Sequence, residues 1–318
     1  MIAKTLTIGI ATAAWLAVSA PVALAADTIG FSVPSLANSF WISATYGVDT
    51  GAKKNGLNLV IVDAGGDSNT AQQISQIQDL IQRNVKAMIV GATNSKAVVP
   101  VVDQALAAGI IVVGLGSRPA NKDLTSVVSA DHYDMGKLQA ECLGKALNGS
   151  GEVAMMAGPT GQYWSDRRAD GFRDTLKAKY PNIKIVAESR LADNRNAALR
   201  VAEDWTQRFP EINGVYSATD DIAAGVIAAF DAAGLTKVKF SASNLSPTAQ
   251  KMIKSGKLAC TSIQTIVGQG KAAVKIVVDA LAGKKVPELI ETPAVLVDAS
   301  NIDTVDLSDV VAPADYRP

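Results

Sequence analysis

Residues 87–115, AMIVGATNSKAVVPVVDQALAAGIIVVGL, contain the pattern that decides the fold. Two short apolar runs, 87–91 and 110–115, flank a longer segment at 98–108 that is long enough for a helix. Both runs are continuously apolar and do not alternate with polar residues, which is typical of strands buried on both faces. The stretch therefore predicts a strand, a helix and a second strand, in a parallel sheet that is covered by helices.

The same alternation extends over the rest of the chain and restarts after residue 130. Before the quoted stretch, it predicts strands at 28–33 and 57–63 and helices at 40–55 and 69–83. After residue 130, it predicts strands at 152–157, 183–187, 214–217 and 238–241, and helices near 163–178, 194–208 and 221–233. The chain is thus expected to be α/β with two units of similar design, which agrees with its length of 318 residues.

The first 25 residues have the pattern of a secretory signal peptide. Lys4 precedes an apolar run at 6–18, and Ala23-Leu24-Ala25 forms a small-residue cleavage site. The run is shorter than the roughly 20 apolar residues that span a bilayer. We therefore expect a mature chain that begins near Ala26 and works outside the cytoplasm.

Composition and the rarer residues exclude several classes of function. Lys plus Arg and Asp plus Glu are both 30, so no charge bias indicates a nucleic acid or an anionic membrane as partner. Cys142 lies in a helix-like segment and Cys260 in a strand-like one. We expect two separate buried thiols, although an oxidising compartment leaves one disulfide possible. His132 is the only histidine, which rules out a Cys/His zinc cage, and it is interpreted as a polar group of the surface or the cleft.

No set of residues predicts catalysis. A Ser-His-Asp triad would need His132, and the chain has no G-x-S-x-G elbow. The loop at 63–67 follows a strand but matches neither a dinucleotide-binding nor a phosphate-binding glycine loop. The chain is accordingly predicted to be no enzyme and to need no cofactor or metal.

Residues that suit binding follow the predicted strands. In open parallel sheets, ligands bind beyond the carboxyl ends of the strands. Asn38-Ser39-Phe40-Trp41 follows the first strand, where an aromatic ring can lie against a ligand and an amide can hydrogen-bond its edge. Because adjacent residues point differently, we expect one of the two rings in the core and the other in the cleft. Tyr163-Trp164 follows the first strand of the second unit and is placed to wall the cleft from the other side.

Five short motifs occur in an order and spacing that characterise a known family. They are TIGFS at 28–32, NSFW at 38–41, QDLIQR at 78–83, DRRADGF at 166–172 and SGKL at 255–258. Together they resemble the type I periplasmic solute-binding proteins of the ribose-binding-protein family. This resemblance implies two Rossmann-like lobes with parallel sheets, joined by three hinge strands. It places the first lobe at 26–130 plus 265–293 and the second at 131–264 plus 294–318. It also implies a monomer that delivers a sugar or polyol to the membrane permease of an ABC importer.

The resemblance also implies which residues touch the ligand. Asn38, Phe40, Trp41, Arg168 and Gln264 match contact positions of the family. Elsewhere the chain departs, because Gly116-Ser117 replaces an Asp-Arg pair, Arg118 is displaced by one step, and Asn194, Thr219 and Asn244 replace other contact residues. The loss of two carboxylate acceptors disfavours an ordinary aldopyranose, so a polyol, a deoxygenated sugar or another small polar molecule fits as well. The predicted ligand-binding residues are Asn38, Phe40, Trp41, Asp67, Trp164, Arg168, Asn194, Thr219, Asn244 and Gln264.

Two alternatives stay open at this point. If Asp67 pairs with Arg168, the site would accept a neutral ligand, and without that pair it would favour an anion. The first lobe is also similar to the periplasmic trimethylamine N-oxide sensor, through residues 33–36, 40–43, 46–47 and 64–66. This second resemblance implies a protein that presents a bound solute to a membrane histidine kinase. It also implies an aromatic cage around the solute, but three positions of that cage are occupied here by polar residues, Asp67, His132 and Asn244.

Overall fold

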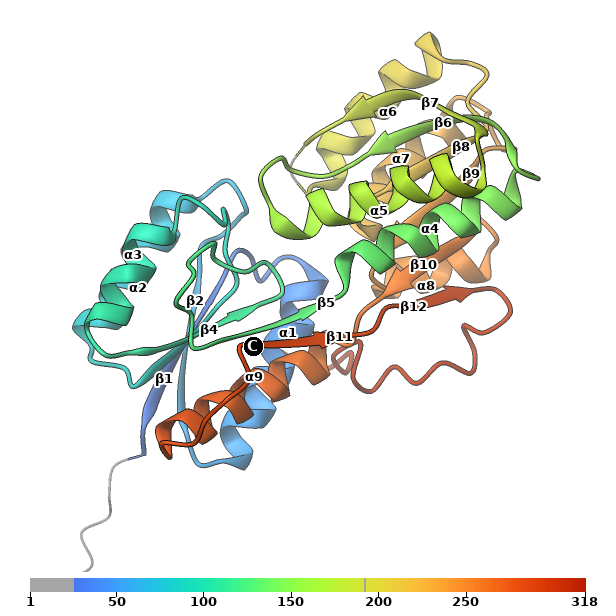
Figure 1. Cartoon of the computed structure of the whole chain (residues 1–318). Helices are drawn as coiled ribbons and strands as arrows, with labels where there is room; N and C mark the ends of the chain where they lie inside the picture. Colours follow the sequence, from blue (N-terminus) through green and yellow to red (C-terminus); the bar gives the residue numbers. More distant parts are fainter. Residues whose placement is uncertain (1–25, 192) are drawn as a thin grey trace, which may run out of the picture.

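A computed structural model describes residues 26–191 and 193–318, and it contains two lobes (Figure 1). The predicted signal peptide, 1–25, lies outside the described residues. Each lobe contains a six-stranded sheet, in the order β11-β5-β4-β3-β1-β2 for the first and β12-β10-β9-β8-β6-β7 for the second. Every pairing that joins these strands is parallel except that of β12 with β10. The predicted α/β class with two parallel sheets is confirmed.

The first lobe is built from six strands and four helices. Its strands are β1 (Thr28–Val33), β2 (Asn58–Asp63), β3 (Ala87–Val90), β4 (Ile111–Leu115), β5 (Ser126–Ala130) and β11 (Leu289–Thr292). Its helices are α1 (Ser39–Lys54), α2 (Thr70–Gln82), α3 (Val99–Ala107) and α9 (Ile266–Leu281). Helices α1 and α9 pack together on one face of the sheet, and α2 and α3 pack on the other. The strands are therefore buried on both faces, as their continuous apolar sequences predict.

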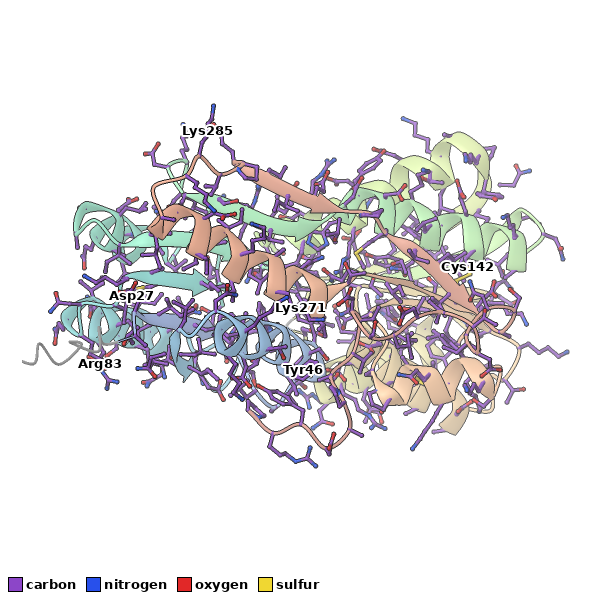
Figure 2. The ribbon with its side chains drawn as sticks, turned by 90° about the horizontal axis from the view of Figure 1, so that it is seen from below. Asp27, Tyr46, Arg83, Cys142, Lys271 and Lys285 are labelled. Atoms are coloured by element: carbon purple, nitrogen blue, oxygen red, sulfur yellow. A yellow bond between two sulfur atoms is a disulfide. The ribbon has the colours of Figure 1, made fainter. Side chains whose placement is uncertain are left out.

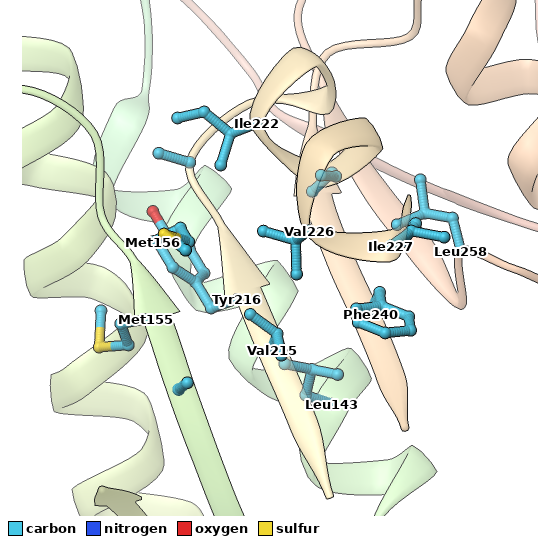
Figure 3. Packing of buried hydrophobic residues seen from close by; sticks show 14 of the residues in the cluster. Leu143, Met155, Met156, Val215, Tyr216, Ile222, Val226, Ile227, Phe240 and Leu258 are labelled. Atoms are coloured by element: carbon cyan, nitrogen blue, oxygen red, sulfur yellow. The ribbon is translucent and has the colours of Figure 1, made fainter. Parts of the chain in front are cut away.

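The second lobe follows the same plan. Its strands are β6 (Ser150–Met156), β7 (Asn182–Ser189), β8 (Gly214–Ser217), β9 (Lys239–Ser243), β10 (Cys260–Ile263) and β12 (Val295–Asp298). Its helices are α4 (His132–Ala146), α5 (Tyr163–Lys179), α6 (Arg195–Arg208), α7 (Asp220–Ala232) and α8 (Pro247–Lys254). The core of this lobe includes Tyr216 of β8, whose ring lies 4.5 Å from that of Phe172, and Figure 3 shows Tyr216 among other buried residues of the cluster, Met156 and Val215 included.

The chain crosses between the two sheets at three places. These lie between β5 and α4, between β10 and α9, and between β11 and β12. The C-terminal segment then contacts both lobes. Val310 packs in the core of the second lobe, whereas the amide of Ala312 donates to Ser43 Oγ at 3.1 Å and the ring of Tyr316 lies 5.0 Å from that of Tyr46. The end of the chain, which the resemblance assigns to the second lobe, therefore also contacts the first lobe.

The expectation of two separate thiols is wrong. Cys142 of α4 and Cys260 of β10 form a disulfide, with Cα atoms 6.6 Å apart. Figure 2 labels Cys142 on the second lobe. The two residues are separated by 118 positions, but α4 packs across β9 and β10, which brings the helix and the strand into contact. A cysteine in a helix and a cysteine in a strand can therefore form a disulfide when the helix packs on that strand.

Candidate functional site

A cavity lies between the lobes, at the carboxyl ends of both sheets. Phe40, Trp41, Asp67, Gly116 and Ser117 line it from the first lobe, and His132, Trp164, Arg168, Asp193, Thr219 and Asn244 from the second, with Gln264 at the second crossing. Since the lining comes from both lobes, a solute held here would touch both at once. This is the place that the topology of parallel sheets predicts for a ligand.

Aromatic rings form the apolar walls of the cavity. The Phe40 and Trp41 rings meet edge to face, with centroids 5.1 Å apart. Trp41 is only 6% exposed and also packs into the core of the first lobe. Its ring lies on Gly91, where a Cβ atom would come within 2.2 Å of it. As expected, one ring (Trp41) enters the core and the other (Phe40) lines the cleft, but the Trp41 ring is large enough to reach the cavity as well.

Arg168 supplies the positive charge of the cavity from within α5. Its side chain is 2% exposed, and its Nη1 donates to the carbonyl of Ala218 at 2.8 Å. Burial lowers the pKa of its guanidinium to about 10, so the group stays charged at neutral pH. Its acidic neighbours on α5 are engaged elsewhere, since Asp166 pairs with Arg190 at 2.7 Å. Among the described residues Arg168 forms no salt bridge, with Asp67 or with any other acid.

His132 is buried beneath the cavity and orients Arg168. Arg168 Nε donates to His132 Nδ1 at 3.3 Å, and His132 Nε2 lies 3.2 Å from Ser129 Oγ. Burial, and then the charge of Arg168, holds the pKa of His132 well below its usual range. The imidazole is therefore neutral, with its proton on Nε2 where it can donate to Ser129. Of the two places that the sequence predicts for His132, the surface and the cleft, the structure has the cleft, where it is buried and hydrogen-bonded at both ring nitrogens.

Two carboxylates enter the cavity from opposite lobes. Asp67 follows β2 and Asp193 follows β7. Burial raises the pKa of Asp67 to about 6, and burial together with the charge of Asp67 raises that of Asp193 to about 8. The Thr219 hydroxyl donates to Asp193 Oδ1, and Asn38 Nδ2 lies 3.4 Å from Asp193 Oδ2 and 3.2 Å from Asp221 Oδ2.

The hydrogen bonds of the cavity continue into the three crossings. Gln264 Nε2 donates to Asn244 Oδ1 at 3.1 Å. Gln269 Nε2 donates to Thr292 Oγ1 at 2.7 Å and lies 3.5 Å from Gln264 Oε1. Thr292 Oγ1 lies 3.4 Å from the carbonyl of Ser129, the residue whose hydroxyl meets His132. Groups that line the cavity are thus connected to each segment about which the lobes would move.

Most of the residues predicted to bind the ligand line this cavity. They are Phe40, Trp41, Asp67, Trp164, Arg168, Thr219, Asn244 and Gln264. Asn38 and Asn194 do not. Asn38 Oδ1 accepts from the amide of Phe40 and caps α1, while Asn194 Oδ1 accepts from the amide of Ala197 and caps α6.

Sequence reasoning missed Asp193 by one residue. Asp193 lines the cavity, while its neighbour Asn194 is used as a helix cap. The available signal was the strand end at 191–194, where two adjacent polar residues precede a helix. Only one of them can be the cap, which leaves the other for the cleft.

The cavity and the two lobes define a binding protein, and the comparisons give its family. The model of the periplasmic binding protein domain matches residues 29–285, so the chain belongs to that family. The ribose import binding protein RbsB of Bacillus subtilis is 31% identical over 268 residues, which cover 84% of this chain and 85% of that protein. The xylitol-binding protein of Mycolicibacterium smegmatis is 30% identical over 281 residues, which cover 88% and 78%.

A solved structure has the same fold. It is an ABC transporter periplasmic solute-binding protein from Actinobacillus succinogenes with bound D-allose, and it matches with a TM-score of 0.82 at 28% identity, over 88% of this chain and 100% of that one. The resemblance to the ribose-binding-protein family is confirmed, whereas these comparisons give no support to the sensor alternative. No helix among residues 26–191 and 193–318 is both long and apolar enough to cross a membrane.

Proposed function

We propose that this protein is the periplasmic solute-binding component of an ABC importer and that it binds a sugar, a polyol or a similar small polar solute in the cavity between its lobes. The observation that carries the proposal is the composition of the cavity. Aromatic rings, a buried guanidinium, carboxylates and amides converge there from both lobes. Rings suit the apolar face of such a solute, and the polar groups suit its hydroxyls.

The rest of the molecule supports this proposal. The relatives include a xylitol-binding protein and a structure with bound D-allose. The Cys142–Cys260 disulfide fits the oxidising periplasm, into which the predicted signal peptide would export the chain.

The lobes are proposed to close on the solute as a monomer and to present the closed form to a membrane permease. The proposed moving units are 26–130 with 265–293 and 131–264 with 294–318. A solute that contacts both lobes favours the closed form over the open one by those contacts.

Thermal unfolding and calorimetric titration against a panel of sugars and polyols test the site. A true ligand raises the melting temperature, and Arg168→Ala lowers its affinity by about 10- to 100-fold, because hydrogen bonds to a charged group contribute about 1.5–3 kcal/mol. Trp41→Ala is expected to weaken binding as well. Arg167→Ala is the matched control, since Arg167 is exposed on the same helix and faces Tyr133 and Asp170. A ligand whose affinity is unchanged in both Trp41→Ala and Arg168→Ala would refute this site.

A further inference from the structure

The charged groups that line the cavity do not balance. Among the described residues of the lining, Asp67 and Asp193 carry carboxylates and Arg168 alone carries a cation. Arg118, an arginine of the first lobe, is not among the lining residues. Its guanidinium stacks on the ring of Tyr163, 4.0 Å from the ring centroid. The cavity thus has one negative charge in excess when all three groups are ionised. Arg168 does not pair with Asp67, which is the case in which the sequence favours an anion, but the second carboxylate, Asp193, reverses that preference.

The groups around Asp193 deepen this negative environment. Asp220 and Asp221 open α7 beside it, and both help to raise its pKa. Asp220 is buried and accepts from the amide of Ser246 at 2.7 Å, while Asp221 faces Asn38 and Arg195. The N-terminus of α7 offsets part of this charge through its backbone N–H groups. Arg168 attracts Asp193 but does not pair with it, so no protein cation neutralises the carboxylate directly.

Closure of the lobes creates this imbalance. Asp67 belongs to the first lobe and Asp193 to the second, so the open form holds them apart in water and the closed form places both in one small cavity. Two carboxylates that share a buried site repel each other, so ionising both costs free energy. One of them takes up a proton unless a cation enters the site. The raised pKa values of both groups agree with this requirement.

The remaining walls suit a cation with an organic body. Phe40 and Trp41 line the cavity together with the carboxylates, while the ring of Trp164 is taken up by the guanidinium of Arg168, 5.0 Å from its centroid. A ligand cation near the face of an aromatic ring gains about 0.5–2 kcal/mol. Asn244, Gln264 and Arg168 also line the cavity and supply amide and guanidinium groups for hydroxyls.

We propose that the solute carries a protonated amine and is an amino-alditol or amino sugar, with its ammonium between Asp67 and Asp193 and its hydroxyls at Arg168, Asn244 and Gln264. This inference rests on the proposed function and names the solute class of the same cavity. The ammonium takes the place of the proton that the two carboxylates would otherwise share in the closed form.

Matched pairs of solutes test the proposal by calorimetric titration. The pairs are 3-amino-1,2-propanediol with glycerol, 1-amino-1-deoxy-D-glucitol with D-glucitol, and D-glucosamine with D-glucose. In at least one pair we expect the ammonium member to bind about tenfold or more tightly, since charges a few ångströms apart interact strongly in a cavity. A neutral solute binds the form of the protein in which Asp193 is protonated. Its affinity therefore falls as the pH rises toward about 8, where Asp193 loses that proton. The ratio of the two affinities therefore widens between about pH 6 and about pH 8 for the 3-amino-1,2-propanediol and 1-amino-1-deoxy-D-glucitol pairs, whose amines stay protonated over this range. D-glucosamine is a weaker base, so its pair is compared at about pH 6 only.

Variants separate this inference from a general effect of charge. Asp67→Asn and Asp193→Asn are expected to remove the preference for the ammonium member, so that the ratio of the two affinities within each pair falls toward one. Asp170→Asn, on the exposed face of α5, is the matched control and keeps the preference. If a variant does not fold, the pH dependence of the wild-type protein still decides the question.

Each outcome has a definite meaning. If neutral members bind as tightly as or more tightly than their ammonium partners in every pair, this inference is overturned while the proposed function stands. If no sugar, polyol or amine binds at all, both are overturned. An ammonium preference that persists in both Asp67→Asn and Asp193→Asn would place the cation elsewhere and overturn the assignment to this cavity.

Discussion

At the scale of single residues, two glycines allow the close packing of α4 and α5 that positions Arg168 in the cavity. A Cβ atom on Gly136 of α4 would lie 1.9 Å from the carbonyl oxygen of Arg168, and one on Gly171 of α5 would lie 2.0 Å from that of Tyr133. The two helices therefore touch backbone to backbone. This close approach brings His132, at the start of α4, within hydrogen-bonding distance of Arg168.

Gly136→Ala is therefore expected to destabilise the protein by about 1–3 kcal/mol, because its methyl group must push α4 away from α5. It should also weaken ligand binding, because Arg168 moves with α5. Urea unfolding and titration with the ligand measure the two effects. The control is Gly268→Ala in α9, where the nearest atom would be on the flexible side chain of Asp309 at 3.3 Å. That change should stay within about 1 kcal/mol of the wild type, helped by the better helix propensity of alanine. Equal stability of the Gly136→Ala variant and the wild type would contradict this packing.

The sequence predicts residue types at the cavity better than their individual roles. Strand ends can be located from apolar runs, so Asp67, Thr219 and Asn244 are found among the lining residues. The resemblance points to Asn194 as a contact residue, but backbone geometry decides which of two adjacent polar residues caps a helix, and here it makes Asn194 the cap and leaves Asp193 in the cavity. The burial of His132 depends on the close approach of two helices, which no local pattern indicates.

At the scale of elements, the strands were predictable and the disulfide was not. Continuous apolar runs at β3 and β4 predict burial on both faces, and α9 and α3 provide it. The bridge from α4 to β10 depends instead on which helix covers which strand. That contact joins residues far apart in the sequence, and it follows only from the completed order of strands in the sheet.

The disulfide is expected to stabilise the second lobe without affecting the site. It closes a loop with a sequence separation of 118 residues, and disulfides that close long loops contribute about 2–4 kcal/mol. Reduction should therefore lower the urea midpoint, while the Cys142→Ala/Cys260→Ala variant unfolds at one midpoint with and without reductant. Neither cysteine lines the cavity, so ligand affinity should be unchanged. Two thiols that react in the unreduced native protein would show that the bridge does not form.

At the scale of the whole molecule, the lobes contact each other through side chains beside the cavity. Gln162, at the start of α5, reaches across to the first lobe. Its Oε1 accepts from Ser95 Oγ and Ser117 Oγ, both at 3.0 Å, and its Nε2 donates to the carbonyl of Thr93. These bonds involve no solute. The closed form is therefore stabilised by the protein itself, and the solute adds to that stability.

Gln162→Ala should shift the ligand-free protein toward the open form. It removes three hydrogen bonds between the lobes, each contributing about 0.5–1.5 kcal/mol. Because ligand affinity scales with the fraction of closed protein, it should fall by about 3- to 30-fold. Small-angle X-ray scattering should show a larger radius of gyration without ligand and the wild-type radius at saturation. Gln250→Ala is the control, since Gln250 donates to Leu245 within the second lobe. Unchanged scattering and affinity in Gln162→Ala would mean that solute contacts alone close the lobes.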